Sequence, residues 1–216
     1  MMFATARTGR VTEDVYAVRT MMVNLYIIRN GDRLVCIDAG LGEKGVEKGF
    51  QKLGFNPLSV THLFLTHSDS DHTGGMGAFR YAEVYLSVAE EQMVNGKTAR
   101  TSGKKFNKPL GRAYRTIGDG QIIRAGQIEI RAISVPGHTP GSTAYLADGR
   151  YLFTGDALSL VRNRVHTSPS FFNMDTETQK RSICRLAGLE NVQWLFTAHS
   201  GYTKDFAGAM KAWREC

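Results

Sequence analysis

The densest group of chemically active side chains is the segment HSDSDH, which runs from position 67 to position 72. Its histidines and aspartates, His67, Asp69, Asp71 and His72, are separated by small serines, so they can surround an ion without clashing. Imidazole nitrogens and carboxylate oxygens suit zinc, iron or manganese, and no cysteine lies close enough in the sequence to make the site purely structural. The segment therefore predicts a metal site.

Three further candidate ligands each follow an apolar, strand-like run that ends in a small residue. His138, Asp156 and His199 come directly after the runs 133–137, 151–155 and 194–198. When strand ends lie along one edge of a sheet, the loops that follow them lie side by side. The whole set of four histidines and three aspartates exceeds what one tetrahedral ion needs and is about right for two adjacent ions.

The first half of the chain predicts strands covered on both faces. Nearly continuous apolar runs lie at 15–18, 25–28 and 34–37, and such runs are typical of buried strands. Asn30-Gly31-Asp32 between the second and third runs is a hairpin turn signal. Apolar residues at i, i+4 and i+7 then predict an amphipathic helix over 46–53, which Gly54 can end.

The second half predicts further strands and helices. Residues 87–90 form a capping-box pattern that predicts the start of a short helix. Apolar and charged residues alternate over 128–131, as in a half-exposed strand, and apolar residues spaced at i, i+4 and i+7 predict a last helix over 206–213. This order of elements predicts a mixed α/β layer protein with helices outside a sheet. No repeat or linker divides residues 1–216, so we expect a single domain with a basic loop insertion around 97–115.

Four motifs resemble the metallo-β-lactamase superfamily: HSDSDH, then VPGHTPGS from 135, FTGDAL from 153 and TAHSG from 197. The resemblance is to the hydroxyacylglutathione hydrolase-like subset and implies a four-layer αβ/βα sandwich with its metal site at one edge. It implies one ion held by His67, Asp69 and His138, and another held by Asp71, His72 and His199. Asp156 would bridge the two ions, and Asp38 would be a buried carboxylate below the site.

Asp69 departs from the family pattern, because the motif is HxDxDH in place of HxHxDH. A carboxylate still binds a metal ion, but it is a harder ligand and adds negative charge, which favours iron or manganese more than histidine does. The resemblance thus implies two divalent ions as cofactors, zinc first, with iron or manganese as alternatives.

These residues predict a metal-dependent hydrolase. A water shared between two cations loses a proton near neutral pH and becomes a metal-bound hydroxide, and the same ions polarise the carbonyl that it attacks. Asp71 would orient this water and accept its proton, which makes it the candidate catalytic residue. The expected substrate is a small ester, thioester, lactone or amide. A phosphodiesterase or nuclease, an iron-dependent redox enzyme and a non-catalytic binding protein remain alternatives.

The positive charge of the chain is concentrated in one segment. The 27 basic and 20 acidic residues give a net charge of +7, and residues 97–115 hold seven basic residues and no acidic one. This segment is either a mobile lid that attracts an anionic small molecule or a solvated loop. Only Phe106 and Tyr114 could stack on bases, so the sequence argues against a nucleic-acid partner. It does not indicate an oligomeric state.

The sequence also bears on location. No apolar run approaches the roughly 18 residues of a membrane-spanning helix, so no membrane partner is expected, and the first residues show no apolar signal stretch. The chain has an odd number of cysteines, and they lie far apart in the sequence, at positions 36, 184 and 216. This pattern argues against disulfides and for a reducing compartment. We therefore expect a cytoplasmic protein.

Overall fold

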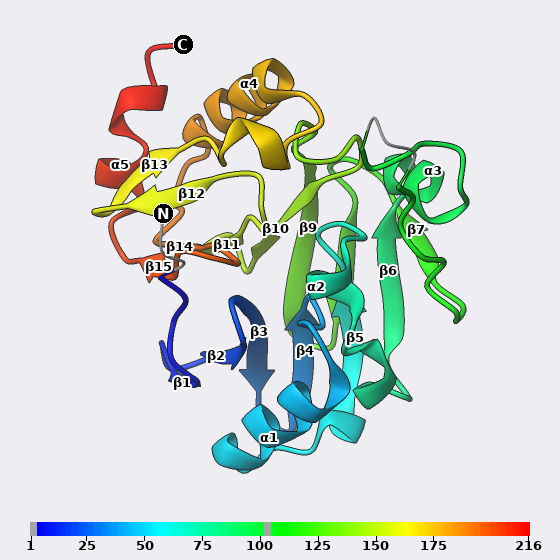
Figure 1. Ribbon diagram of the computed structural model, residues 1–216. Helices are drawn as coiled ribbons and strands as arrows, with labels where there is room; N and C mark the ends of the chain where they lie inside the picture. The colour runs from blue at the N-terminus through cyan, green and yellow to red at the C-terminus, as the bar shows by residue number, and fades with distance from the viewer. Residues whose placement is uncertain (1–3, 102–104) are drawn as a thin grey trace.

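In the computed structural model, which describes residues 4–101 and 105–216, two large β-sheets pack face to face and carry helices on their outer faces (Figure 1). The first sheet has the strand order β1-β2-β3-β4-β5-β6-β7. Its strands are β1 (Gly9–Arg10), β2 (Val15–Thr20), β3 (Val23–Asn30), β4 (Arg33–Ile37), β5 (Val60–Phe64), β6 (Glu83–Ser87) and β7 (Arg115–Ile117). Strands β1 to β4 pair antiparallel, whereas β4 to β7 pair parallel.

The second sheet has the strand order β15-β14-β11-β10-β9-β8, and the separate hairpin β12-β13 lies outside it. The strands are β8 (Ile122–Ala125), β9 (Ile128–Ser134), β10 (Thr143–Ala147), β11 (Tyr151–Phe153), β12 (Ser159–Val161), β13 (Arg164–His166), β14 (Trp194–Phe196) and β15 (Tyr202–Thr203). Strands β11 and β14 pair parallel, and the other neighbours in this sheet are antiparallel.

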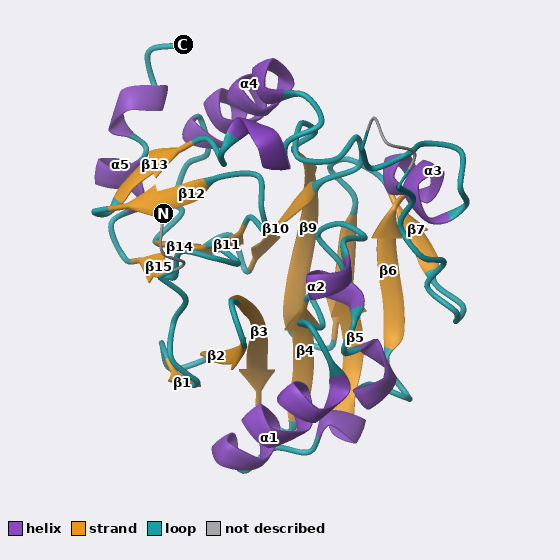
Figure 2. Ribbon diagram, viewed as in Figure 1, coloured by secondary structure: helices purple, strands orange, loops and turns teal. Residues whose placement is uncertain are grey.

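Helices lie on both outer faces, as Figure 2 shows. They are α1 (Glu43–Leu53), α2 (Ser70–Thr73), α3 (Glu91–Val94), α4 (Thr176–Ala187) and α5 (Phe206–Ala209). Val46 and Phe50 of α1 pack on the first sheet, and Ile183 and Leu186 of α4 pack on the second. The layers therefore follow the order helix, sheet, sheet, helix, which confirms the predicted four-layer αβ/βα sandwich. None of the described helices is long and apolar enough to cross a membrane.

The continuous apolar runs of the first sheet are explained by its two cores. Tyr26 and Ile28 of β3 face the core between the sheets, whereas Leu25 and Ile27 face the core under α1. Successive side chains of a strand point to opposite faces, so a strand with a core on each side needs apolar residues at every position. The predicted hairpin is confirmed as the β3–β4 pair, with Gly31 at φ 59° in its turn.

Helix α1 agrees with the prediction, but two later helices differ from it. α1 ends at the predicted Gly54, whose φ of 72° is a left-handed conformation that glycine adopts at little cost. The predicted last helix is interrupted, because α5 ends at Ala209 and a 3-10 turn, Lys211–Trp213, follows it. The capping-box residues also form a 3-10 turn, Val88–Glu90, before α3 begins.

The cysteine prediction was wrong. Cys184 of α4 and Cys216 near the end of the chain form a disulfide, with their Cα atoms 5.9 Å apart. The two cysteines are separated by 32 positions in the sequence, but the last segment folds back so that Trp213 packs against the core under α4. Distance along the chain was therefore a poor guide to distance in space. Cys36 is a buried free thiol on β4, as expected.

Candidate metal centre

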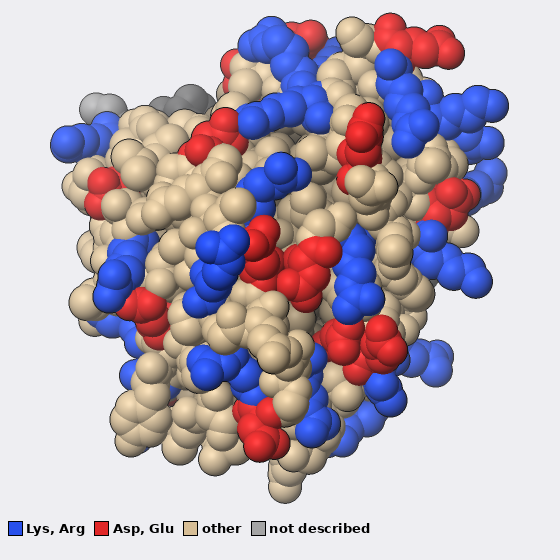
Figure 3. Space-filling model, turned by 180° about the vertical axis from the view of Figure 1, so that it is seen from behind, with Lys and Arg blue, Asp and Glu red and all other residues tan. Residues whose placement is uncertain are grey.

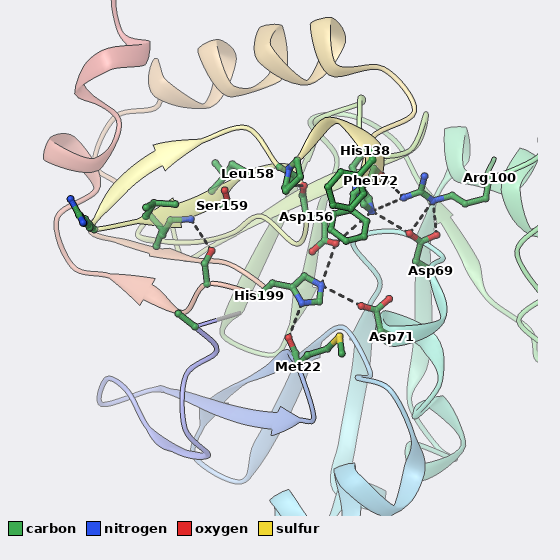
Figure 4. A pocket seen from close by; sticks show the side chains of 18 residues that line it. Met22, Asp69, Asp71, Arg100, His138, Asp156, Leu158, Ser159, Phe172 and His199 are labelled. Carbon is green, nitrogen blue, oxygen red and sulfur yellow. Dashed lines mark hydrogen bonds and ion pairs between the residues drawn. The ribbon is translucent and has the colours of Figure 1, made fainter. Parts of the chain in front are cut away.

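The predicted ligands all follow strands at one edge of the sandwich, and the structure brings them together. His67 follows β5, and α2 carries Asp71 and His72. The other ligands lie in the loops after β9, β11 and β14, which place His138, Asp156 and His199. Figure 4 shows most of this set around one pocket, with Asp69 and His138 on one side and Asp71 and His199 on the other.

Two glycines allow the ligand loops to pack this closely. Gly137, just before His138, has φ 138°, and a Cβ atom there would lie 2.4 Å from the backbone nitrogen of Gln179. Gly155, just before Asp156, has φ 53°, and a Cβ atom there would lie 2.4 Å from the Thr66 hydroxyl. Contacts this short exclude any side chain, so each loop turns directly at its ligand.

The first ligand cluster consists of His67, Asp69 and His138. The Nε2 atoms of His67 and His138 lie 3.5 and 3.2 Å from Oδ2 of Asp69. Both histidines are buried, with 1% and 3% of their surface exposed, respectively. Two buried imidazole nitrogens and a partly exposed carboxylate thus face one another.

The second cluster consists of Asp71, His72 and His199. Oδ2 of Asp71 lies 3.2 Å from Nε2 of His199 and 3.8 Å from Nε2 of His72. Asp156 lies between the clusters, because its carboxylate oxygens approach Nε2 of His72 at 3.4 Å, of His199 at 3.3 Å and of His138 at 3.5 Å. A single carboxylate therefore borders both clusters.

The donor atoms fit a metal ion. Among the described residues, Nε2 of His67, Nε2 of His72 and Oδ1 of Asp156 are buried and have no hydrogen-bond partner. Buried polar atoms are rarely left unpaired, because their desolvation then goes uncompensated. These atoms converge from different loops, and imidazole nitrogen with carboxylate oxygen is a donor set that binds divalent cations. The residues that the sequence predicts as ligands are therefore close enough together to hold an ion.

Hydrogen bonds on the far side of the rings orient two of the histidines. Nδ1 of His199 donates to the Met22 carbonyl at 2.7 Å, and Nδ1 of His72 lies 2.8 Å from Oδ2 of Asp38. Because a carbonyl only accepts, the Nδ1 atom of His199 carries a proton and its Nε2 faces the cluster.

The carboxylates control protonation of the metal-free site. Burial would lower the pKa of His199, but Asp156 and Asp71 raise it to about 10. Burial opposes the charge of His72 too, yet Asp38, Asp156 and Asp71 raise its pKa well above the ordinary value. Burial would raise the pKa of Asp71, but His72 and His199 lower it to about 2. His199 is therefore protonated at pH 7 while Asp71 is ionised, and the same carboxylates favour the protonated form of His72.

We expect zinc binding to release protons. A metal ion needs the neutral ring nitrogen, so an ion that enters the second cluster at pH 7 displaces about two protons, one from each histidine. Because both pKa values are raised, proton competition weakens as the pH rises towards 10, and the apparent zinc affinity increases over that range. Titration of metal-free protein in weakly buffered indicator solution measures the release. Zinc binding without acidification would contradict this protonation state.

Asp38 lies beneath the second cluster, where the resemblance implied a buried carboxylate. It is 2% exposed and accepts hydrogen bonds from the backbone amide and hydroxyl of Thr66 as well as facing His72. Its φ of 62° is a strained conformation that asparagine and aspartate tolerate better than other side chains. Asp38 thus holds the ring of His72 with Nε2 towards the cluster.

The Asp38→Asn variant is expected to bind zinc about 10- to 100-fold more weakly than the unmodified protein. Asparagine keeps the backbone conformation but removes the charge that orients His72, so the loss reports on the metal site rather than on folding. Competition titration with a zinc-binding dye measures the affinity. Asp148→Asn is a matched control, because Asp148 also has a positive φ, 49°, in an exposed turn. Equal affinities of both variants would exclude the orienting role.

Sequence reasoning missed Glu90. The capping-box pattern predicted that this side chain turns back to Ser87, but it is fully buried and points to the metal loops. Oε1 accepts hydrogen bonds from the amide and hydroxyl of Ser68, and Oε2 accepts them from the hydroxyl of Thr139 and the amide of Gly141. The carboxylate therefore joins the loop of His67 to the loop of His138. Its partners lie at least 22 positions away, so no local pattern could identify them.

The basic segment 97–115 is packed against the molecule at several points. Arg100 donates to Asp69 and to the Phe172 carbonyl. Arg112 donates to backbone carbonyls that include those of Phe79 and Ala82, and Arg115 pairs with Glu83. These contacts contradict a wholly solvated loop. Lys104, one of the seven basic residues, lies outside the described residues. On the face in Figure 3, basic and acidic side chains are interspersed rather than gathered in a single strip.

A pocket of about 630 Å³ opens above the two clusters. Its wall is mostly apolar and comes from the β12–β13 hairpin, the loop before it, the 168–172 segment and the turn between β2 and β3. The large apolar side chains in this wall are Met22, Leu158, Leu160, Val161, Phe171 and Phe172. In Figure 4, Phe172 lies over the ligands next to His138 and Arg100. Phe171 is 78% exposed, so it borders the mouth of the pocket rather than its floor.

Comparison with known proteins agrees with this arrangement. The sequence profile of the metallo-beta-lactamase superfamily matches residues 18–212. The protein described as "Probable metallo-hydrolase YflN" of Bacillus subtilis is 28% identical over 92% of this chain and 89% of its own length. A hydroxyacylglutathione hydrolase of Rhodospirillum rubrum is 32% identical over 68% of this chain. The matched region covers 52% of that enzyme, so the chain spans about half of the enzyme's length.

Solved structures share the same fold. A B3 metallo-beta-lactamase with an active-site glutamic acid superimposes with a TM-score of 0.75 at 24% identity, covering 99% of this chain and 89% of its own. Because the profile match extends over nearly the whole chain and the His and Asp ligand groups come together in space, the chain belongs to the metallo-β-lactamase superfamily.

Proposed function

We propose that this protein is a metal-dependent hydrolase that cleaves a small ester, thioester, lactone or amide carrying an apolar group. The observation that carries this proposal is the set of buried, unpaired donor atoms at the floor of an apolar pocket. These atoms belong to a larger group of seven residues that come together in the structure and that the sequence predicts as ligands: His67, Asp69, Asp71, His72, His138, Asp156 and His199. The superfamily and its hydrolase relatives support a reaction on small molecules.

Zinc is the ion that we propose, because four of the seven donors are histidines. A divalent cation in this position supplies a positive charge that acidifies water and polarises a carbonyl oxygen. The donors form three overlapping groups, two of which share no residue, and this supports a centre with places for two ions. The unpaired Nε2 atom of His72 supports occupancy of the second cluster.

The chain's own residues then serve the attack on the carbonyl carbon. Asp71 borders the pocket with an ionised carboxylate, which can orient a water molecule and accept its proton. His199, 3.2 Å away, faces the same carboxylate and restricts where it points. The contacts of Asp38 with His72 and of the Met22 carbonyl with His199 hold the two rings in place, so these side chains need not reorient during the reaction.

The pocket wall supports a substrate with an apolar acyl or alkoxy part. The side chains of Leu158, Leu160 and Phe172 remove such a group from water while its carbonyl reaches the ligands below. Arg162, on the turn between β12 and β13, also lines the pocket and offers a positive charge for an anionic end of the substrate. A thioester remains in the proposed class because the R. rubrum relative is named for a hydroxyacylglutathione.

The cytoplasmic location stays a prediction. The cysteines do not support it, because the Cys184–Cys216 disulfide is more typical of proteins in an oxidising compartment. Intact-mass measurement after alkylation of protein from freshly lysed cells, with and without reductant, shows which state the thiols have there.

The decisive test combines metal analysis with a substrate screen. Protein purified without added metal is analysed by elemental mass spectrometry and assayed on esters, thioesters, lactones, amides and phosphodiesters. We expect bound zinc, hydrolysis of a carbonyl substrate, loss of activity with a chelator and recovery with zinc. Iron as the dominant ion would favour the redox alternative, and cleavage of phosphodiesters alone would favour a nuclease. Full metal occupancy without turnover on any class would favour a binding protein.

A further inference from the structure

The donors of the first cluster already bind a positive charge from this chain. Nε of Arg100 lies 3.0 Å from both carboxylate oxygens of Asp69, and Nη2 of Arg100 lies 3.0 Å from Nε2 of His138. Two of the three residues that could hold an ion there are therefore in contact with a guanidinium group. Figure 4 shows Arg100 reaching over Asp69 to His138, on the side of the pocket away from His199.

Arg100 is held firmly in this position. Its side chain is only 13% exposed, and Nη2 also donates to the Phe172 carbonyl at 2.7 Å. Its backbone amide donates to the Lys105 carbonyl at 2.7 Å. Asn107, from the same segment, donates to Asp69 Oδ1 at 2.9 Å and to the Ser68 hydroxyl at 2.8 Å. The segment thus presents its arginine to the cluster through contacts at several points.

The carboxylate at position 69 explains why an arginine fits here. A guanidinium group carries its charge on a planar fork of N–H donors that matches a carboxylate, whereas it can make no such ion pair with a neutral imidazole. In this structure Nε of Arg100 lies 3.0 Å from each of the two carboxylate oxygens of Asp69. Asp69 and Arg100 therefore form an ion pair inside the first cluster.

The arginine and a metal ion exclude each other at this cluster. The Nε2 atom of His138 has one lone pair, so it can accept a hydrogen bond from Arg100 or bind an ion, but it cannot do both. A divalent ion among these ligands would also lie within a few ångströms of the guanidinium charge and be repelled by it. Nε2 of His67 in the first cluster and Nε2 of His72 in the second are both buried with no hydrogen-bond partner, but the Arg100 contacts are to residues of the first cluster.

We propose that the Arg100 guanidinium occupies the first cluster as an internal cation, so that the protein holds one tightly bound divalent ion, in the second cluster. A second ion enters only when Arg100 withdraws, and it therefore binds more weakly than the first. This inference rests on the proposed metal-dependent hydrolase, because it requires the second cluster to bind an ion. It assigns to the basic segment a role in setting the metal content of the site.

The test is a zinc titration of metal-free protein by calorimetry, with bound ions counted by equilibrium dialysis and elemental mass spectrometry. The unmodified protein is expected to bind one ion tightly and a second at least about 10-fold more weakly. In Arg100→Ala the second ion is expected to bind at least about 10-fold more tightly than in the unmodified protein. Lys108→Ala, which removes an exposed charge of the same segment, is the matched control and should resemble the unmodified protein.

Cobalt gives a second readout that does not depend on activity. Arg100→Ala should show a new visible absorption band as the second equivalent of cobalt is added, at a concentration where the unmodified protein shows one band only. Arg100→Lys keeps a charge but loses the planar fork, so it should lie between the two. Circular dichroism verifies that each variant is folded.

The outcomes separate this inference from the proposed function. One tight ion in the unmodified protein, with no strengthening of the second in Arg100→Ala, would overturn the role of Arg100 and leave the hydrolase proposal standing. Two equally tight ions in the unmodified protein would overturn it as well. A failure of both proteins to bind any ion would overturn the proposed metal centre and this inference together.

Discussion

The Asp156→Asn variant is expected to bind zinc at least about 100-fold more weakly than the unmodified protein and to lose hydrolysis altogether. Among the residues that the structure describes, Asp156 is the one whose carboxylate approaches histidines of both clusters, at 3.3 to 3.5 Å. Asparagine has nearly the same shape but carries no charge and offers a single acceptor oxygen. The negative charge shared by the two clusters is therefore removed without a change in side-chain volume.

The fold should survive this substitution. The loop is held through the backbone carbonyl of Asp156, which accepts hydrogen bonds from Ser168 and Gln179 and is present in the variant as well. Competition titration measures the zinc affinity, and circular dichroism tests the fold. Asp32→Asn, in the exposed turn between β3 and β4, makes the same chemical change away from the site. Zinc affinity equal to that of this control would remove Asp156 from the metal centre.

The second large effect is expected for Glu90→Gln, in stability rather than in charge at the metal. We expect the free energy of unfolding to fall by about 3–6 kcal/mol, because two of the four hydrogen bonds to the carboxylate are lost at about 1.5–3 kcal/mol each. The amide nitrogen of glutamine is itself a donor, so the backbone amide that faces it loses its acceptor, and the hydroxyl beside it must accept instead of donate. The loops of His67 and His138 should then separate, so zinc binding weakens too.

Urea denaturation followed by tryptophan fluorescence measures this loss of stability. Glu47→Gln, on the exposed side of α1, is the control and should change stability by less than about 0.5 kcal/mol. If Glu90→Gln were as stable as that control, the carboxylate would not be what joins the two ligand loops. If stability fell but zinc affinity stayed the same, the ligands would be positioned independently of Glu90.

The sequence was most informative where a side chain's role depends on its immediate neighbours. His138, Asp156 and His199 could be found because each follows a recognisable strand and a small residue, and strand ends at one edge of a sheet must lie together. Helix α1 and the β3–β4 hairpin were predicted for the same reason, since periodicity and turn residues act over a few positions. The resemblance of the four motifs added the four-layer order of the fold.

The roles of Arg100, Glu90 and Cys184 depended on the tertiary structure. Arg100 meets Asp69 across 31 positions, Glu90 meets Thr139 across 49, and Cys184 meets Cys216 across 32. No propensity or spacing rule specifies such partners, because packing of the layers decides which surfaces meet. The sequence by itself therefore determined which residues could bind a metal and which strands carry them. Only the tertiary structure determined that a buried glutamate joins their loops and that an arginine contacts two of the three residues of the first cluster.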